Sequence, residues 1–204
     1  MFKLAEQFSF EQDTEACWLA ASCGYGADIS WQLHLQSKSA MTHLSSGPVL
    51  ASLAIYTRPP LGATSWRDLP GRQMEIPSDV LHCGFQFRRD MFAEWEDLLD
   101  LHLEFGAINN KHIEVFAEGH GAAEAAADIF PSGEISFRIQ TLAVFRGVGV
   151  NVPLNATDPL EYSTVRVKAL LPHYSFVPAV LRKTSDEDGT LRAVEVLFGP
   201  EEAE

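Results

Sequence analysis

The stretch from Asp28 to Gln36 reads Asp-Ile-Ser-Trp-Gln-Leu-His-Leu-Gln, and from Ile29 onward apolar and polar residues alternate without a break. Side chains of a β-strand point alternately to opposite faces of a sheet, so this pattern is typical of a strand with one buried face. The alternation recurs at 134–140, 81–87 and 165–169, and less regularly at 49–57 and 113–117. We therefore expect a mainly β protein. The residues expected in its core include Ile29, Trp31, Leu33, Leu35, Ile135, Phe137 and Ile139.

The dipeptide Asp188-Gly189 lies between two further strand-like runs, at 180–184 and 190–196. A tight turn between antiparallel strands requires positive φ angles, which glycine adopts without steric cost. The sequence therefore predicts a β-hairpin near the end of the chain.

One segment has a different period. Between Asp90 and Glu104 the apolar residues recur three and four positions apart, as in an amphipathic helix. Asp90 is a suitable N-cap, and Gly106 follows at a position where helices commonly stop. We predict one helix at about 90–105.

Length and composition favour one packed domain over residues 1–204, because 46% of the residues are hydrophobic. The expected architecture is an antiparallel β-sandwich or a strongly bent sheet with the single helix, and an α+β fold is the alternative. A shift of 106 residues aligns Ile29–Leu33 with Ile135–Ile139. One interpretation is a duplication, and the other is chance. The duplication would consist of halves 1–60 and 107–200, joined by a loop at 58–79, a strand at 80–88 and the helix at 90–105.

The charge balance restricts the classes of partner. The chain has 15 Lys and Arg against 28 Asp and Glu, a formal net charge of −13. Nucleic-acid binding depends largely on Lys and Arg, so we expect no nucleic-acid partner. No apolar run approaches the roughly 18 residues of a membrane span, and the segment 1–6 lacks the apolar core of a secretory signal. These features predict a cytoplasmic protein without a membrane association.

Motifs for catalysis or a cofactor are not evident. The patterns GxSxG, GxxxxGKS and HExxH are absent, and the three cysteines (Cys17, Cys23 and Cys83) form no CxxC pair. We interpret the cysteines as structural free thiols and expect no cofactor. The sequence thus inclines away from an enzyme, and it leaves the oligomeric state open.

The most chemical-looking cluster is a possible metal site at 112–120. If this segment is one strand, four side chains of metal-ligand type share a face, namely His112, Glu114, Glu118 and His120. Neighbouring positions on that face are about 6.6 to 7 Å apart, so one ion would need Glu118, His120 and ligands from another strand. The other interpretation is a solvated strand face with Ile113, Val115 and Ala117 buried behind it.

An acidic surface is the candidate for protein binding. The predicted helix contains acids without any Lys or Arg after Asp90, and like charges at helical spacing repel one another. The excess of acid therefore indicates either simple solvation or a surface kept for a basic partner. The irregular loop at 58–79 is a second candidate surface. The candidate binding residues are Glu94, Glu96, Asp97 and Asp100 on the helix, with Trp66 and Arg67 in the loop.

Three classes of function remain open. The first is a non-enzymatic cytoplasmic protein that presents an acidic surface to a basic protein, in an inhibitor-like or immunity-like role. A helix followed by strands, with many acids, is similar in layout to small immunity proteins that neutralise bacterial toxins, although no diagnostic motif assigns the chain to a family. The second class is a β-sandwich enzyme or metal-binding protein using the strand from His112 to His120. The third is a structural or assembly subunit.

Overall fold

In the computed structural model of the chain, the structure describes residues 1–5, 8–24, 29–41, 48–57, 63, 65–77, 81–88, 96–122, 130, 132–171, 177–186 and 188–199. These residues are mostly in β-strands, with one α-helix and a short 3-10 helix, η1 (Trp66–Asp68). The first strands are β1 (Phe2–Leu4), β2 (Phe8–Phe10), β3 (Trp18–Cys23), β4 (Ile29–Gln36), β5 (Ala40–Met41) and β6 (Pro48–Thr57). The central strands are β7 (Gln73–Pro77), β8 (Leu81–Arg88), β9 (Glu96–Asn109), β10 (His112–Ala122) and β11 (Glu134–Val152). The last elements are α1 (Pro159–Leu170), β12 (Val177–Ser185) and β13 (Leu191–Gly199).

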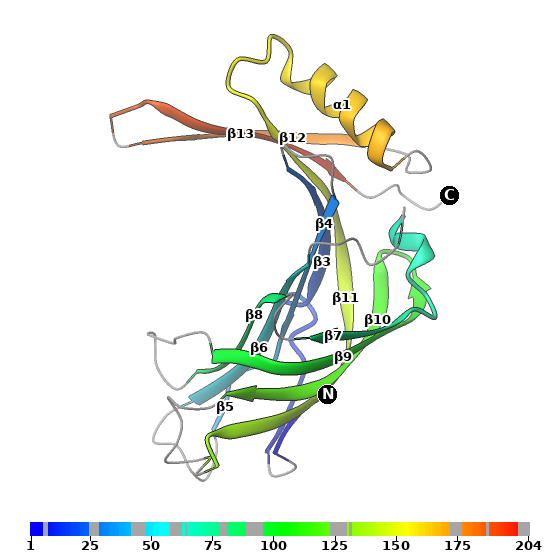
Figure 1. Cartoon of the computed structure of the whole chain (residues 1–204), viewed down its shortest axis with the longest axis vertical. Helices are drawn as coiled ribbons and strands as arrows, with labels where there is room; N and C mark the ends of the chain where they lie inside the picture. The colour runs from blue at the N-terminus through cyan, green and yellow to red at the C-terminus, as the bar shows by residue number, and fades with distance from the viewer. Residues whose placement is uncertain are drawn as a thin grey trace.

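All the strands belong to one extensive, strongly bent sheet (Figure 1). Its main path runs β10-β9-β8-β6-β4-β3-β11-β1-β2, and β10 also pairs with β11. The pairing of β3 with β11 is parallel, and the other pairings are antiparallel. The expectation of a mainly β protein with one helix is therefore confirmed, in the form of a strongly bent sheet.

The hydrophobic core lies along the inward-facing side of this sheet. The expected apolar faces of β4 and β11 are buried, with Trp31 at 2% exposure and Phe137 at 3%. In the core, Trp66 of η1 stacks on Phe145 of β11, with 4.8 Å between the ring centroids. The core also takes in β1 and β2 through Phe2, Leu4, Phe8 and Phe10. Alternation in the sequence thus predicted the core positions of β4 and of the start of β11 correctly, whereas it did not single out β1 and β2.

The expected hairpin is also present at the end of the chain. Strands β12 and β13 pair antiparallel, and the N–H of Gly189 donates to the carbonyl of Asp186 within the turn. Gly189 has a φ of 82°, the left-handed conformation that favours glycine at such a position. Figure 1 shows this hairpin extending from one end of the bent sheet, with α1 beside it.

The helix predicted at about 90–105 is wrong over the residues that the structure describes. Residues 96–109 form strand β9, and 90–95 lie outside the described residues. From Leu101 to Phe105 the apolar side chains alternate inward, and Asp100, His102 and Glu104 lie between them. The adjacent leucines Leu98 and Leu99, beside a break in the β9–β10 register, imitate helical spacing. The likeness in layout to immunity proteins depended on that helix and no longer holds.

The helix instead lies at α1, where the sequence predicted a strand at 165–169. Asp158 is the N-cap, its Oδ1 accepting from the backbone N–H groups of Leu160 and Glu161, and Pro159 follows at the first position. The alternation of Val165, Val167 and Ala169 was too short to decide between the two structures. The buried positions of α1 are Ser163 and Val167, four residues apart as in a helix.

Candidate functional site

A cross-strand row of charged and titratable residues runs over the outer face of five neighbouring strands. The sheet register pairs Glu75 of β7 with His102 of β9, and His102 with Glu118 of β10. It then pairs Glu118 with Arg138 of β11, and Arg138 with Lys3 of β1. Residues paired in this way project from the same face, so their side chains are neighbours.

A second, parallel row lies beside the first. Asp100 of β9 is paired with His120 of β10, and His120 is paired with Ser136 of β11. Members of the two rows line an open groove of about 800 Å³. The residues lining it are Lys3, Ala5, Glu75, Asp100, His102, Glu118, Gly119, His120, Ser136, Phe137 and Arg138.

Two histidines in the groove are held by carboxylates. His102 Nδ1 lies 2.5 Å from Glu75 Oε1, and His120 Nδ1 lies 2.9 Å from Asp100 Oδ2. An ionised carboxylate only accepts hydrogen bonds, so Nδ1 of each ring has to bear a proton to make this contact. A neutral imidazole that donates from Nδ1 gives its carboxylate a hydrogen bond, and the carboxylate keeps its negative charge.

The backbone around Asp100 is shaped to make this contact. Asp100 Oδ1 also accepts from the backbone N–H of His120, at 2.9 Å. The β9–β10 register shifts immediately beyond this pair, and bulges of this kind re-aim side chains. Gly119 has no Cβ, and a Cβ at this position would overlap the Asp100 carbonyl oxygen. The local sequence therefore permits the close approach of Asp100 to β10.

The other charged pair in the groove joins β10 to β11. Arg138 donates to Glu118 Oε2 from Nε at 3.0 Å and from an Nη atom at 2.8 Å. The same guanidinium lies 5.8 Å from the centroid of the Phe116 ring, and the His102 ring approaches Phe116 edge-on at 6.4 Å. Glu118 and Arg138 thus largely neutralise each other at the centre of the row.

Acids dominate one side of the groove. Strands β7, β9 and β10 contain acidic residues but, throughout their described ranges, neither Lys nor Arg. Their outward-facing acids, which we call the acidic face, are Glu75, Asp100, Glu104, Glu114 and Glu118. Lys3 and Arg138 lie at the other side, on β1 and β11.

The structure brings together parts of the two separate candidate sites. Asp100, from the expected helix, contacts His120, from the expected metal strand. The side chains of Glu96 and Asp97, on β9, and the whole of Glu94 lie outside the described part. His112 lies further along the same face of β10. Glu114 Oε2 accepts from the backbone N–H of Ala107 at 3.2 Å.

The segment at 58–79 is not irregular throughout, because 73–77 form strand β7, and its two candidate binding residues have different environments. Trp66 is 4% exposed and belongs to the core, so its indole is not on the surface. Arg67 is exposed on η1. Ser65 caps this short helix by accepting from the Arg67 backbone N–H. The predicted pairing of these residues as one binding surface therefore reduces to Arg67.

Sequence reasoning missed four members of the cross-strand row, namely Lys3, Glu75, His102 and Arg138. All four had a partial signal, because each of them lies between two apolar residues. Their assembly into one row had no such signal, since it depends on which strands become neighbours. Register is a property of the folded sheet.

The groove has only part of what a metal site or a hydrolase needs. A carboxylate that orients an imidazole is the usual outer shell of a metal ligand. Among the described residues, however, no group of three or more His, Cys, Asp or Glu side chains could hold an ion. Asp100 and His120 also resemble the orienting acid and the base of a hydrolase, respectively. No hydrogen bond joins Ser136 Oγ to His120, although the two residues are paired across strands.

The buried thiols lie away from the groove. Cys17 and Cys23 are free and buried, as expected, and the side chain of Cys83 is outside the described part. Burial raises the pKa of the Cys17 thiol, against the opposing effect of hydrogen bonds to Gln36 and Thr141. Burial likewise raises the pKa of Cys23 to about 11. Protonated thiols of this kind are poor nucleophiles.

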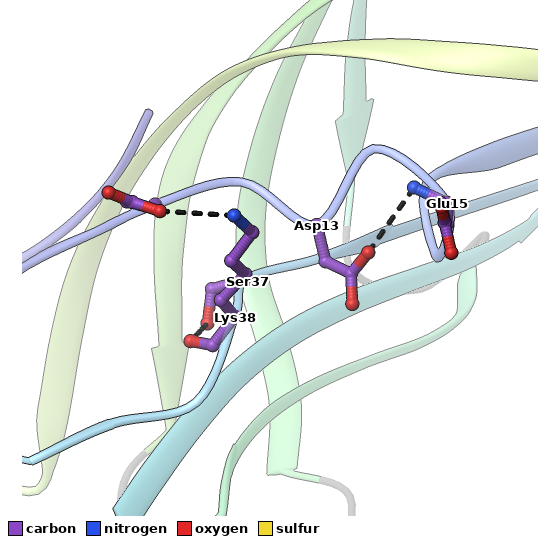
Figure 2. A network of polar contacts seen from close by, with 5 residues as sticks. Asp13, Glu15, Ser37 and Lys38 are labelled. Carbon is purple, nitrogen blue, oxygen red and sulfur yellow. Dashed lines mark hydrogen bonds and ion pairs between the residues drawn. The ribbon is translucent and has the colours of Figure 1, made fainter.

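A second polar network contrasts with the groove because it ties loops together (Figure 2). Lys38 Nζ donates to Glu11 Oε2 at 3.1 Å, and the Glu15 backbone N–H donates to Asp13 Oδ1 at 3.2 Å. Ser37 Oγ donates to the Lys38 carbonyl at 3.0 Å. These contacts hold the segment between β2 and β3 beside the end of β4.

No helix in the described part of the chain is long and apolar enough to span a membrane. The sequence matches no protein-family model, no curated protein and no solved structure.

Proposed function

We propose that this chain is a non-enzymatic, cytoplasmic binding protein whose acidic face docks a basic protein. An inhibitor-like role is one form of this proposal, because a protein that neutralises a basic partner has to cover it with opposite charge. The observation that supports the proposal is that β7, β9 and β10 bring five outward acids together with no Lys or Arg among these strands.

The partners of these acids strengthen the case. Glu75 and Asp100 are paired with imidazoles and keep their negative charge while those rings are neutral. Their side chains are 81% and 60% exposed, so an approaching protein can reach both carboxylates. Complementary charge of this kind accelerates association and discriminates against wrong partners.

The position of the groove also supports the proposal. The groove lies directly on the acidic face, and inward residues of β9 and β10 behind it, such as Leu101, Leu103 and Val115, are buried. Binding there requires no opening of the core. A preformed, rigid surface reduces the entropy lost on binding.

The test begins with affinity capture from the native cell and identification of the bound proteins. The captured partner is then purified, and its association rate is measured with the wild type and with Glu75→Lys/Glu104→Lys. Among the described residues, no backbone N–H donates to either of these carboxylates, so the variant should fold normally. We expect association to slow by about tenfold at low salt, with a flatter dependence on salt.

A matched control is Glu161→Lys, which makes the same kind of charge change on the exposed first turn of α1. It should leave the association rate nearly unchanged and cost only a fraction of a kcal/mol of stability through the helix dipole. If the double reversal associates as fast as the wild type with the same salt slope, the acidic face is not the docking surface.

A further inference from the structure

The charges along the cross-strand row are segregated by sign. Glu75 lies at the β7 end, and Lys3 lies at the β1 end. Between them, Glu118 and Arg138 neutralise each other in an ion pair. Among the described residues, Lys3 Nζ contacts no carboxylate, and the residue is exposed. The groove is thus acidic at one end and basic at the other.

We infer that the groove binds a dipolar segment of its partner, with a cationic side chain at the Glu75 and Asp100 end and a carboxylate at the Lys3 end. The inference rests on the proposed function and deepens it, since it makes Lys3 a specificity-determining residue. It also fixes the direction in which the partner segment crosses the strands.

The spacing of the two ends follows from the sheet. Four inter-strand steps of about 4.8 Å separate β7 from β1, so the ends of the row are about 19 Å apart. An extended chain advances about 3.3 Å per residue, so the two charges of the partner segment should be about six residues apart. The same groove lines both ends, so one continuous segment can reach them.

A uniformly acidic docking surface predicts the opposite effect of changing Lys3. Replacing Lys3 by Glu would then extend the negative surface and strengthen binding of a cationic segment. In a dipolar groove the same change removes the lysine that attracts the carboxylate of the segment. The sign of the effect therefore separates the two arrangements.

The probes are three synthetic peptides of equal length in a Ser/Thr background, added to the full-length protein labelled with ¹⁵N. One has an arginine and a glutamate about six residues apart, one has arginine at both positions, and one has glutamate at both. We expect the mixed peptide to bind about two- to fivefold more tightly than the double-arginine peptide. It should shift the amide signals of both Glu75 and Lys3.

In Lys3→Glu this order should reverse, so that the double-arginine peptide binds more tightly. Lys38→Glu makes the same charge change outside the groove and should keep the wild-type order. The inference is overturned if the wild type prefers the double-arginine peptide, if no peptide binds, or if Lys3→Glu leaves the order unchanged. Preference for the double-arginine peptide would still support the proposed function, whereas preference for the double-glutamate peptide would overturn both.

Discussion

On strands β9, β10 and β11, most of the residues that face inward are apolar and almost fully buried, whereas the outward face contains the charged residues of these strands. Leu101, Leu103 and Phe105 of β9 are at most 1% exposed, while Asp100 and Glu118 on the outer side have 60% and 39% of their side chains exposed. The period of two along each strand places these contrasting sets next to each other in the sequence.

If the acidic face docks a partner as proposed, stability and recognition are separated by the two faces of one sheet. Burial of apolar area stabilises the fold, and it depends on the inner residues. Exposed ion pairs contribute little to stability, so the outer residues are free to be selected for binding. Substitutions one residue apart should therefore have very different consequences.

The largest expected effect comes from the inner face. Phe137→Ala and Trp31→Ala should each lower the free energy of unfolding by about 3–5 kcal/mol, through lost transfer energy and the cavity left behind. Arg138→Ala, the next residue on β11 and an outward one, should cost less than about 1 kcal/mol. Urea unfolding curves of the three variants check this, and equal losses for Phe137 and Arg138 would contradict the separation of the faces.

A second inner-face effect should appear at high pH. Burial raises the pKa of Cys23 from its ordinary value of 9.0 to about 11, and the nearby Arg166 guanidinium opposes part of the increase. The unfolded chain loses the thiol proton above about pH 9, while the folded protein retains it up to about pH 11. Stability should therefore fall over this window, by about 2–3 kcal/mol, as the pH rises.

The control for this effect is Cys23→Ala, which has no thiol to ionise at that position. Its free energy of unfolding, measured from pH 8 to 11, should fall less steeply than that of the wild type. The buried thiol of Cys17 remains in both proteins, so the difference between the curves isolates Cys23. Parallel curves would show that Cys23 ionises as easily in the folded protein as in the unfolded chain.

An intermediate effect is expected where the outer face requires a special backbone. A Cβ at Gly119 would overlap the carbonyl oxygen of Asp100, so Gly119→Ala should destabilise the protein by about 1–3 kcal/mol. Gly24→Ala is the matched control, because no atom lies within 4 Å of its added Cβ. Thermal melting of both variants measures the difference, and a stable Gly119→Ala variant would show that Asp100 can move away without cost.

Much of the fold was predictable because burial enforces a pattern on the sequence. Apolar and polar residues alternate in β4 and at the start of β11, and no helical spacing competes with this pattern. The dipeptide Asp188-Gly189 is typical of a tight turn. The prediction at β9 was wrong because two adjacent leucines, at 98 and 99, precede the alternating part of the strand. Together with the neighbouring apolar residues they give the three- and four-residue spacing of a helix. The strand predicted within α1 was wrong for the converse reason. The helix-capping residues Asp158 and Pro159 are a stronger indication of structure than a short alternating run.

The groove was only partly predictable. The acids and the histidine strand were recognised as unusual, because charge excess and ligand-type residues are visible in the sequence. The assembly of these residues into one groove was not predictable, because Lys3, Glu75 and Arg138 come from strands that are far apart in the chain. Pairing between strands depends on long-range packing, which no local period records.

The smallest expected effect concerns the Asp100–His120 pair on the outer face. A double-mutant cycle with Asp100→Asn and His120→Gln should give a coupling energy of about 0.2–1 kcal/mol, because the two side chains are 60% and 52% exposed. The asparagine keeps an oxygen that can accept the His120 backbone N–H, so the cycle reports on the side-chain pair rather than on the bulge. High salt should reduce the coupling further, since exposed charges are screened.

A coupling above about 2 kcal/mol would mean that the outer face also holds the sheet together. Substitution of these acids would then change stability as well as binding. The two faces would not be separate in function at the proposed docking surface.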